Sequence, residues 1–297
     1  MGIRGDVLVK LIPNYPRFVT KNWKPFDAVK LARWTGKIVF RKEDNARKYT
    51  AFYATGVYGG MATGYGVGCC FRCVFCWVEL SRDFPEIYGD FYSPEEAYEK
   101  IVEAAKKYNV HKARISGCEP TLCQKHLIGV LEHIEDDPWI KIFILETNGI
   151  LFGIDKDYVR RIFDKFDKVY IRVSLKAGTP EAFEKKTGAK RENFEIPFQA
   201  IKNIIETAGI ETLGKRWHVA AMSLDPRIMT WEERFSLFKK LMEIDPLIVL
   251  LLEEEVVDPY DTTLLRLKVA GWELKWPLKK IYKPARELLY ELLKKQS

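Results

Sequence analysis

Short apolar segments that resemble buried strands alternate with segments of helical periodicity along most of this 297-residue chain. Parallel neighbouring strands need long connections, usually right-handed helical crossovers, so the alternation predicts a parallel sheet covered by helices. The expected class is α/β, with six strand-helix units and no second folded domain, internal repeat or low-complexity tract. The predicted strands are one within residues 49–68, then Lys112 to Ser116, Ile142 to Leu145, Val169 to Leu175, Trp217 to Leu224 and Leu247 to Leu252.

The predicted helices are set by apolar spacing and by capping residues such as Ser93, which precedes two glutamates. A short helix over residues 26–34, ending at Gly36, precedes the alternating units. The later helices run from Ser93 to Tyr108, near Lys125 to Glu135, near Tyr158 to Phe166, near Phe194 to Ala208, from Trp231 to Met242 and from Leu278 to Lys295.

The predicted fourth strand has an alternating pattern that is unusual for an all-parallel sheet, whose strands are normally apolar throughout. Arg172, Ser174 and Lys176 alternate there with apolar residues. Since helices would cover the apolar face, these side chains should point into a polar lumen, where they could bind a carboxylate or phosphate. A water-exposed edge strand is the alternative explanation.

Three cysteines follow the first predicted strand in the run G-C-C-F-R-C-V-F-C-W. Cys69, Cys73 and Cys76 are separated by three and then two residues, which suits one tight loop holding three irons of a 4Fe-4S cube. A structural zinc site is the alternative, because cysteines separated by two residues also bind zinc. Zinc normally needs a second pair or histidines, and none of the four histidines repeats the pairing.

The cysteine run resembles the signature of the radical S-adenosylmethionine (SAM) superfamily, C-x3-C-x2-C with an aromatic residue, here Phe75, before the last cysteine. The resemblance implies a partial (β/α)6 TIM-like barrel with an N-terminal extension. It implies a 4Fe-4S cluster whose fourth iron binds SAM, an electron that cleaves SAM to a 5'-deoxyadenosyl radical, and hydrogen abstraction from a substrate. It also places Phe75 against the adenine of SAM.

Further segments after the predicted strands resemble the SAM-binding motifs of that superfamily. S-G-C-E-P-T-L resembles its G-G-E-P motif, which implies that Gly117 and Glu119 meet the methionyl amine of SAM. E-T-N-G supplies Glu146 and Asn148, at a place where relatives orient the ribose or carboxylate. The alternative for Glu119 is that it is only an acid at the start of the following helix. The alternative for Asn148 is that it forms a simple turn with Gly149. Ser174 and Lys176 join Glu119 as residues expected to fix the amino acid part of SAM.

Other polar residues have less specific interpretations. His218 is expected to be a buried, hydrogen-bonded histidine rather than a ligand, and one acid among Glu253, Glu254 and Glu255 could meet SAM or substrate. Cys118 and Cys123 are expected to pack, although a second metal site is an alternative.

One subgroup resembles the chain more closely. The runs F-C-W-V-E-L-S-R-D, S-G-C-E-P-T-L, T-N-G-I-L and V-S-L-K-A are similar to segments of archaeal wyosine-forming tRNA enzymes. Those enzymes carry additional N-terminal cysteines for a second cluster, whereas this chain has no cysteine before Cys69. The resemblance therefore implies a different radical reaction on a related scaffold.

The positive charge is concentrated at the N-terminus. Residues 1–50 contain twelve Lys or Arg and four acids, although the whole chain has a net charge of only +7. We expect residues 1–55 to form a basic, aromatic extension and residues 56–297 to form the barrel domain. The mixture of basic and aromatic residues favours RNA binding. The alternative is that the aromatic residues pack on the barrel while the lysines stay solvated.

The sequence composition indicates the cellular compartment. No hydrophobic signal opens the sequence and no apolar run could span a bilayer, so we expect a cytoplasmic protein without membrane contact. Four of six cysteines lie between residues 69 and 76, which favours reduced metal chemistry over disulfides. Few glutamines beside many Lys and Glu are typical of a thermophile.

The leading hypothesis is a radical SAM enzyme that takes electrons from a ferredoxin- or flavodoxin-like donor. Its substrate is unidentified, and RNA is one possible class. An activase that installs a glycyl radical on a partner protein is a second hypothesis. A zinc-containing nucleic-acid-binding module without catalysis is the third.

Overall fold

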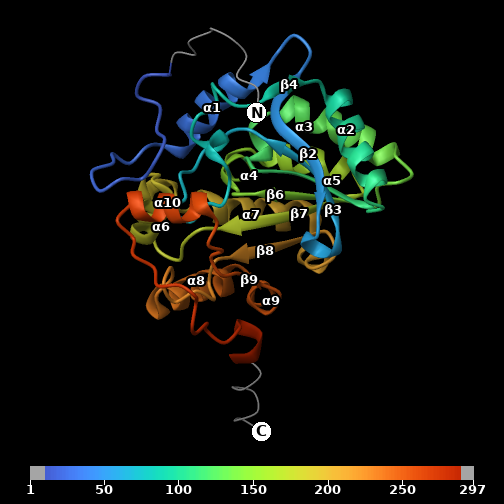
Figure 1. Cartoon of the computed structure of the whole chain (residues 1–297). Coiled ribbons are helices and arrows are strands. Elements are labelled where there is room, and N and C mark those ends of the chain that lie inside the picture. The colour runs from blue at the N-terminus through green and yellow to red at the C-terminus, as the bar shows by residue number, and fades with distance from the viewer. Residues whose placement is uncertain (1–10, 289–297) are drawn as a thin grey trace.

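Six parallel strands form the centre of the fold, which is a computed structural model that describes residues 11–288. Their order in the sheet equals their order in the chain, so each connection crosses to the next strand along one direction. Figure 1 shows the strands side by side and curved, with helices outside them. The parallel strands are β3 (Met61–Gly66), β5 (Lys112–Ser116), β6 (Ile142–Thr147), β7 (Val169–Leu175), β8 (Trp217–Ala221) and β9 (Glu253–Glu254).

Three antiparallel strands extend the sheet beyond β3. The strand β2 (Ala46–Thr55) forms a hairpin with β3 and also pairs with β1 (Phe40–Arg41) and β4 (Asp90–Tyr92). Residues on both sides of position 55 thus lie in one sheet. The assignment of residues 1–55 and 56–297 to separate parts remains a prediction about domains.

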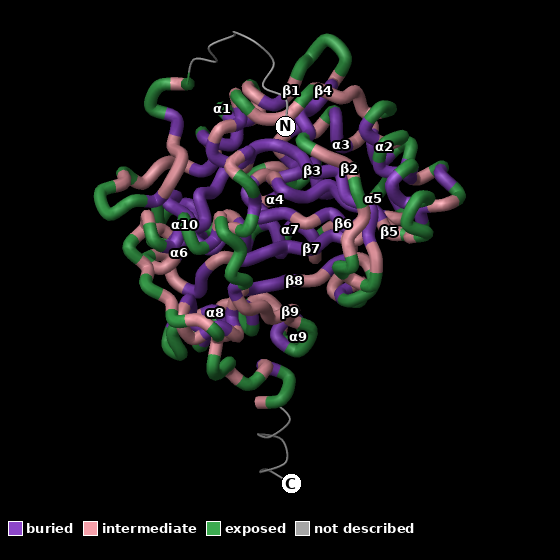
Figure 2. Tube along the Cα trace, in the orientation of Figure 1, coloured by how far each residue is buried: buried purple, intermediate pink, exposed green. Residues whose placement is uncertain are grey.

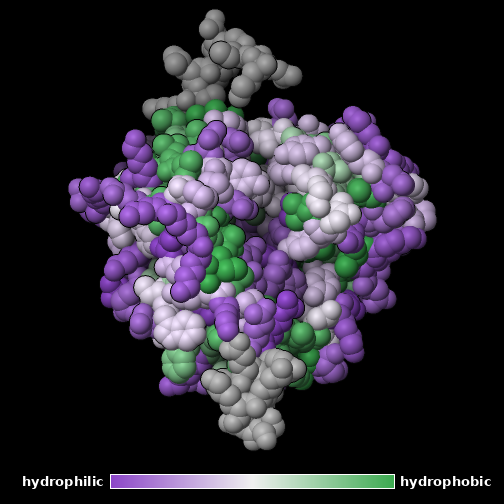
Figure 3. Space-filling model, turned by 60° about the horizontal axis from the view of Figure 1, so that its bottom comes forward, coloured by the Kyte–Doolittle hydropathy of each residue, from purple (hydrophilic) through white to green (hydrophobic). Residues whose placement is uncertain are grey.

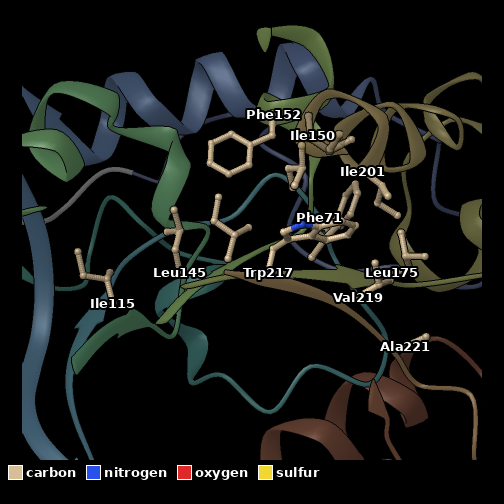
Figure 4. Close-up of a cluster of buried hydrophobic side chains, with 14 of the residues drawn as sticks. Phe71, Ile115, Leu145, Ile150, Phe152, Leu175, Ile201, Trp217, Val219 and Ala221 are labelled. Carbon is tan, nitrogen blue, oxygen red and sulfur yellow. The ribbon is translucent and has the colours of Figure 1, made fainter. Parts of the chain in front are cut away.

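Helices cover the outer, apolar face of the parallel sheet. Alternate strand residues such as Ile115, Leu145 and Trp217 are fully buried there and pack with Phe71, Phe152 and other apolar side chains (Figure 4). The strands are the most continuously buried part of the chain (Figure 2). The helices are α1 (Ala28–Val39), α2 (Pro94–Lys107), α3 (Gln124–Asp136), α4 (Ile150–Ile154), α5 (Lys156–Lys165), α6 (Pro180–Thr187), α7 (Ile196–Ala208), α8 (Trp231–Ile244), α9 (Pro246–Leu250) and α10 (Asp261–Val269).

The predicted α/β class and partial six-unit barrel are confirmed, and local capping explains several boundaries. Ser93 and Glu96 form a capping box at the start of α2, as the sequence suggested. Thr179 and Asp155 are simple N-caps of α6 and α5, with side chains that accept from backbone N–H groups. No helix among residues 11–288 is long and apolar enough to cross a bilayer.

Several element predictions were wrong. The apolar run from Leu247 to Leu252 is not a strand: its first part is α9, since Pro246 stands at the first turn and Asp245 caps Leu247. The periodicity of a short apolar run does not distinguish a strand from a helix. The sixth parallel strand is β9, which has only two residues. Gly36 does not end a helix but lies inside α1, where the carbonyl oxygen of Leu122 would be 3.3 Å from an added Cβ.

The end of the chain also differs from the prediction. Residues 278–284 are not helical, and the helix expected over Leu278 to Lys295 begins at Ala285, with its later part outside the described residues. The strand expected to reach Leu224 ends at Ala221. Sequence reasoning missed α4, α6, α9 and α10, of which α4 and α9 have five residues each, too few for a periodic signal.

Aromatic residues of the N-terminal part pack on the barrel, as the alternative to RNA binding predicted. Tyr15 is buried and hydrogen-bonded to Thr35, with its ring 5.2 Å from the partly exposed ring of Trp34. Phe26 pairs with Ala189 through an isolated bridge. Several basic side chains of α1 nevertheless remain exposed.

Candidate active site

The cysteine run forms the loop that follows β3, at the end of the sheet where all six parallel strands finish. Cys73 is buried, whereas Cys69 and Cys76 are partly exposed, and the Cys76 N–H donates to the Cys73 carbonyl over 3.2 Å. Two backbone bonds tie the loop to the end of α6: Arg72 N–H donates to Thr187 and Val74 N–H donates to Lys186. The loop is therefore a fixed part of the fold.

Three buried arginines hold the carbonyl groups of this loop, and we call Arg72, Arg82 and Arg266 the loop arginines. Arg72 donates to the carbonyl of Cys69 over 2.9 Å, and Arg82 donates to that of Cys73 over 2.8 Å. Arg266, on α10, donates to the carbonyl of Cys76 over 2.6 Å. All three are at most 2% exposed. Each cysteine thus has its carbonyl bound by a different guanidinium group.

The electrostatic surroundings of the thiols suit an anionic metal centre. Burial raises the pKa of Cys73 to about 12, while Lys176 and Arg82 act in the opposite direction. A hydrogen bond with the neighbouring Cys70 thiol lowers the pKa of Cys69 to about 7. Positive groups close to buried sulfur atoms would stabilise thiolates bound to iron. This donor set fits a 4Fe-4S cluster.

The same residues do not form a site for a single ion. Within residues 11–288, no group of three or more His, Cys, Asp or Glu side chains converges so as to hold one metal ion. In a cluster each thiolate binds a different iron, so such convergence is not needed. A zinc ion, by contrast, requires its ligands around one point.

Glu119 joins the ends of two strands to the cysteine loop. Its buried carboxylate accepts from Thr121 N–H and hydroxyl, from the Thr147 hydroxyl over 2.8 Å and from Asn148 N–H over 2.8 Å. Its own N–H donates to the Gly68 carbonyl. Asn148 in turn donates to the Cys70 thiol over 3.1 Å and lies 3.7 Å from the Cys69 sulfur. The structure brings Glu119, Asn148 and Cys69 together.

The backbone around Gly117 is compact. Gly117 has a φ of 74°, a left-handed conformation that favours glycine, and lies against Tyr65 and Gly66. The Cys118 sulfur would be 2.5 Å from an added Cβ of Gly66, so Cys118 fills the space left by a glycine. Burial raises the pKa of Cys118 to about 12, and Cys123 is buried. Phe75 is 7% exposed and belongs to the apolar core.

Glu146 belongs to the lumen of the barrel rather than to the cysteine loop. It accepts two hydrogen bonds of 3.1 Å from Arg114 on β5 and one of 3.3 Å from Ser116. Arg114 also donates to Thr63 on β3. The side chains that donate to Glu146 are thus on β5, whereas Asn148 follows the end of β6. Glu146 remains one-fifth exposed.

Arg172 on β7 reaches past β8 to β9 on the face opposite the helix-covered core, in agreement with a polar inner face of this strand. It donates to Glu253 over 2.8 Å, and its Nη2 lies 2.7 Å from Glu255. His218 on β8 lies 2.9 Å from the Tyr170 hydroxyl and 2.5 Å from Glu253. His218 is thus hydrogen-bonded on both ring nitrogens, as expected, although it is partly exposed rather than buried.

The three consecutive glutamates at β9, of which Glu255 follows the strand, point in two directions. Glu253 and Glu255 reach the lumen and are each about one-third exposed. Glu254 is buried on the other side, where it pairs with Arg234 at 2.6 Å. The alternation of a strand decides which of these acids can meet a ligand.

Ser174 and Lys176 lie together at the end of β7. Lys176 donates to the Ser174 hydroxyl over 2.6 Å, and its ammonium group is close enough to Cys73 to stabilise a thiolate there. No ion pair involving Lys176 occurs among residues 11–288, so its charge is directed at the cysteine loop without a carboxylate partner.

Aromatic rings lie beside the third cysteine, and we call Tyr53, Tyr65, Trp77 and Tyr260 the aromatic rim. Tyr53 and Tyr65 stack at 4.3 Å, and Trp77 lies 6.4 Å from Tyr65 and 6.2 Å from Tyr260. Tyr53, Trp77 and Tyr260 are 43%, 40% and 55% exposed. They extend from β2 and β3 to the segment before α10. Figure 3 shows hydrophilic residues around a shadowed recess near the centre of one face of the molecule.

A family model supports this interpretation of the cysteine loop. The description "Radical SAM superfamily" applies to residues 64–220, more than half of the chain, and this match includes all three cysteines and the polar ends of β5, β6 and β7. The chain belongs to the radical SAM superfamily. It is accordingly an enzyme of a superfamily that uses a 4Fe-4S cluster and SAM, which sets aside the non-catalytic zinc module.

Sequence relatives differ in what their names describe. A Methanococcus maripaludis (strain C7) protein named "Probable GTP 3',8-cyclase" is 30% identical over 182 residues, covering 60% of this radical SAM chain and 56% of the relative. A Methanocaldococcus jannaschii protein named for glycyl-radical enzyme activation is 31% identical over 110 residues, covering 37% of each chain. This chain therefore spans little more than half of the first of these curated relatives, and less of the second.

A solved structure confirms the fold. The structure titled "Structure of TYW1 with a lysine-pyruvate adduct bound" superposes on the radical SAM chain with a TM-score of 0.50 and 16% identity, covering 80% of this chain and 74% of the other. At that identity the likeness concerns the fold alone.

Sequence reasoning missed the residues that support the radical SAM site from a distance. Arg82 and Asp83 stand in the R-D segment of the wyosine-like run, so a signal existed, but it did not indicate that they hold the loop. Arg266 carries no motif, and only the tertiary structure brings α10 against Cys76. Trp77 adjoins Cys76 in the sequence, whereas Tyr260 is far away in the chain.

Proposed function

We propose that this radical SAM enzyme acts on a nucleobase, carried by RNA or by a nucleotide. Cys69, Cys73 and Cys76 would hold three irons of the cluster, which together with bound SAM supplies a 5'-deoxyadenosyl radical for hydrogen abstraction. The observation that carries the substrate class is the aromatic rim beside Cys76, in which Tyr53, Trp77 and Tyr260 are exposed. Exposed aromatic rings bind bases of any sequence by stacking.

The amino acid part of SAM would be fixed by groups of opposite charge. Lys176, held by Ser174, offers an ammonium group to the carboxylate of SAM. Glu119 has one carboxylate oxygen, Oε2, with a single hydrogen bond, from Asn148 N–H, so this oxygen retains capacity for the SAM amine. The other oxygen holds the strand ends in position.

The remaining predicted residues would shape the site or hold other groups in position. Gly117 and its neighbours let the backbone approach the ligand closely, since no side chain occupies the Gly117 position. The Phe75 ring packs in the core, so its backbone is the part that would face the adenine. Asn148 would hold the loop through the Cys70 thiol. Glu146, held by Arg114 and Ser116 in the lumen, would face substrate rather than SAM.

The lumen suits recognition of a base edge. Glu146, Glu253 and Glu255 are partly exposed acceptors, whereas Arg114 and Arg172 are almost fully buried behind them. Carboxylates accept hydrogen bonds from amino and imino groups of bases. A base stacked on the rim could therefore direct its N–H groups to these acids.

A glycyl-radical activase is the second candidate, favoured by the similarity to the M. jannaschii relative. Such an enzyme must accept a protein backbone instead of a planar ring. The kinship with wyosine-forming enzymes is also part of the proposal, as are a ferredoxin- or flavodoxin-like donor and a cytoplasmic location.

The decisive experiment is anaerobic reconstitution with iron and sulfide, followed by SAM, dithionite and an assay for 5'-deoxyadenosine. We expect formation of 5'-deoxyadenosine, and its rate should rise when tRNA or purine nucleotides are added. Absence of any 5'-deoxyadenosine would contradict the radical chemistry. An unchanged rate with nucleic acid, together with a rise on adding a glycyl-radical protein, would support the second candidate.

The aromatic rim has its own test. Trp77→Ala should weaken binding of tRNA or nucleotide by about 1–3 kcal/mol, because one stacking surface is lost. Trp231→Ala removes a similarly exposed tryptophan from α8 and serves as the control. Equal effects of the two substitutions on binding, measured by fluorescence titration, would show that the rim does not hold a base.

A further inference from the structure

A groove lies on the outer side of α1, apart from the lumen, and we call it the α1 groove. It has a volume of about 770 Å³ and is formed by α1, the β1–β2 turn, β4 and the segments that follow β5 and β6. Apolar side chains form its floor. They are Ala32, Ile38, Phe40, Phe91, Leu122 and Leu151.

Four basic residues, Arg33, Lys37, Arg41 and Lys42, line the α1 groove with a single acidic residue, Glu43, and Lys30 lies next to them on α1. Lys30, Arg33 and Lys37 stand three and four residues apart, so they share one exposed face of α1, which contains no acidic residue. Arg41 follows at the end of β1, and Lys42 lies in the turn after it. Of these five side chains, only Arg41 has an ion pair among residues 11–288, with Asp44 at 2.5 Å. Four positive charges therefore remain without a carboxylate partner there.

The opposite face of α1 packs directly on the cysteine loop. The Thr35 hydroxyl lies 3.5 Å from the Cys69 carbonyl oxygen, and an added Cβ on Gly68 would be 2.6 Å from the Thr35 methyl group. An α-helix with its side chains is about 10–12 Å thick, so roughly this distance separates the basic face from the backbone of Cys69. The α1 groove is thus a short path to a cluster held by Cys69 that does not cross the lumen.

We propose that the α1 groove is the docking surface for the protein that reduces the cluster, an acidic one-electron carrier with an exposed cofactor. This inference rests on the proposed function, which needs an electron from outside. SAM and substrate would occupy the lumen, so a protein donor has to approach from another side. Acidic groups of the donor would pair with Arg33 and with the lysines that have no carboxylate partner, which steers a fast and weak encounter.

The groove fits such a donor better than it fits RNA. The rings of the aromatic rim are on other elements, and Phe91 in the groove is covered by the Arg41 guanidinium at 5.0 Å from its centroid. Few ring faces are thus open for stacking, although the charge is high. Small apolar contacts with a charged margin are typical of weak redox encounters. RNA binding to the groove is the competing outcome.

The test compares two electron sources and two variants. Arg33→Glu/Lys37→Glu reverses two exposed charges of the groove, and Lys215→Glu/Lys239→Glu reverses two exposed charges far from it, with the same change of net charge. With reduced flavodoxin at low salt, we expect the groove variant to form 5'-deoxyadenosine at least about tenfold more slowly than wild type. With photoreduced deazaflavin, a small donor without a protein surface, the rates should be equal.

A second readout does not depend on the cluster. Binding of flavodoxin to the cluster-free protein, measured by biolayer interferometry, should weaken with salt and should be lost in the groove variant but not in the control variant. Flavodoxin-driven rates and binding that are unchanged in the groove variant would overturn the proposal. Loss of tRNA binding alone would assign the surface to RNA and overturn it too. No product with deazaflavin in wild type would instead contradict the proposed function.

Discussion

Buried arginines occur at two places in this enzyme, and their partners differ. The loop arginines donate mainly to backbone carbonyls and to Asp83, which is fully buried. The lumen arginines, Arg114 and Arg172, pair with glutamates that remain partly exposed. Carbonyls at fixed positions need permanent donors, whereas a partly exposed glutamate can exchange its arginine for water or a ligand. The first arrangement makes a rigid cofactor loop, and the second makes an adaptable binding surface.

The largest effect should come from breaking the loop arrangement. Arg266→Ala leaves the carbonyls of Cys76, Val78 and Glu79 without their donor and Asp83 with Arg82 alone, so we expect a loss of about 3 kcal/mol in unfolding free energy. Urea unfolding of the cluster-free protein measures it. Arg266→Lys keeps the charge but not the fork-shaped donor set and should lose less. A loss below about 1 kcal/mol in Arg266→Ala would show that the loop is not held this way.

A smaller effect is expected in the lumen. Arg172→Met should lower the unfolding free energy by only about 1–2 kcal/mol, because water can hydrate Glu253 and Glu255 once their partner is gone. The same urea series allows direct comparison with Arg266→Ala. If Arg172→Met costs as much stability as Arg266→Ala, the distinction between the two places fails.

The lumen pairs also predict a pH dependence of stability. Burial by itself would raise the pKa of Glu253, but hydrogen bonds from His218 and Arg172 outweigh it and hold the pKa at about 2, below the ordinary 4.5. A lowered native pKa stabilises the fold above pH 4.5, and this contribution disappears as the pH falls from 4.5 towards 2.

Measuring the unfolding free energy between pH 4.5 and 2 tests the direction of this pH dependence. Glu253→Gln lacks the titrating group, so its unfolding free energy should fall less steeply than that of wild type over this pH range. Parallel curves for the two proteins would mean that Glu253 is not held as a carboxylate by these partners.

Much of the barrel followed from sequence pattern, because strands and helices have different apolar periods. The strands Lys112–Ser116 and Val169–Leu175 match the structure at both ends, and the alternation around Arg172 correctly indicated a polar lumen. The prediction of the last strand was wrong, because a five-residue helix and a two-residue strand are too short to show a periodic pattern. The three cysteines were identifiable, because ligands of one cluster must stand close together in one loop.

The chain itself determined the α/β class, the radical SAM chemistry and the loop that holds its cysteines, since these depend on residues that are neighbours or recur at a fixed period. Only the tertiary structure decided which guanidinium groups hold that loop, how Tyr260 joins Trp77 and which basic residues share the groove behind Cys69. Arg266 is 190 residues from Cys76 in the chain, and such contacts arise from the crossing of α10 over the barrel end, which no local pattern encodes.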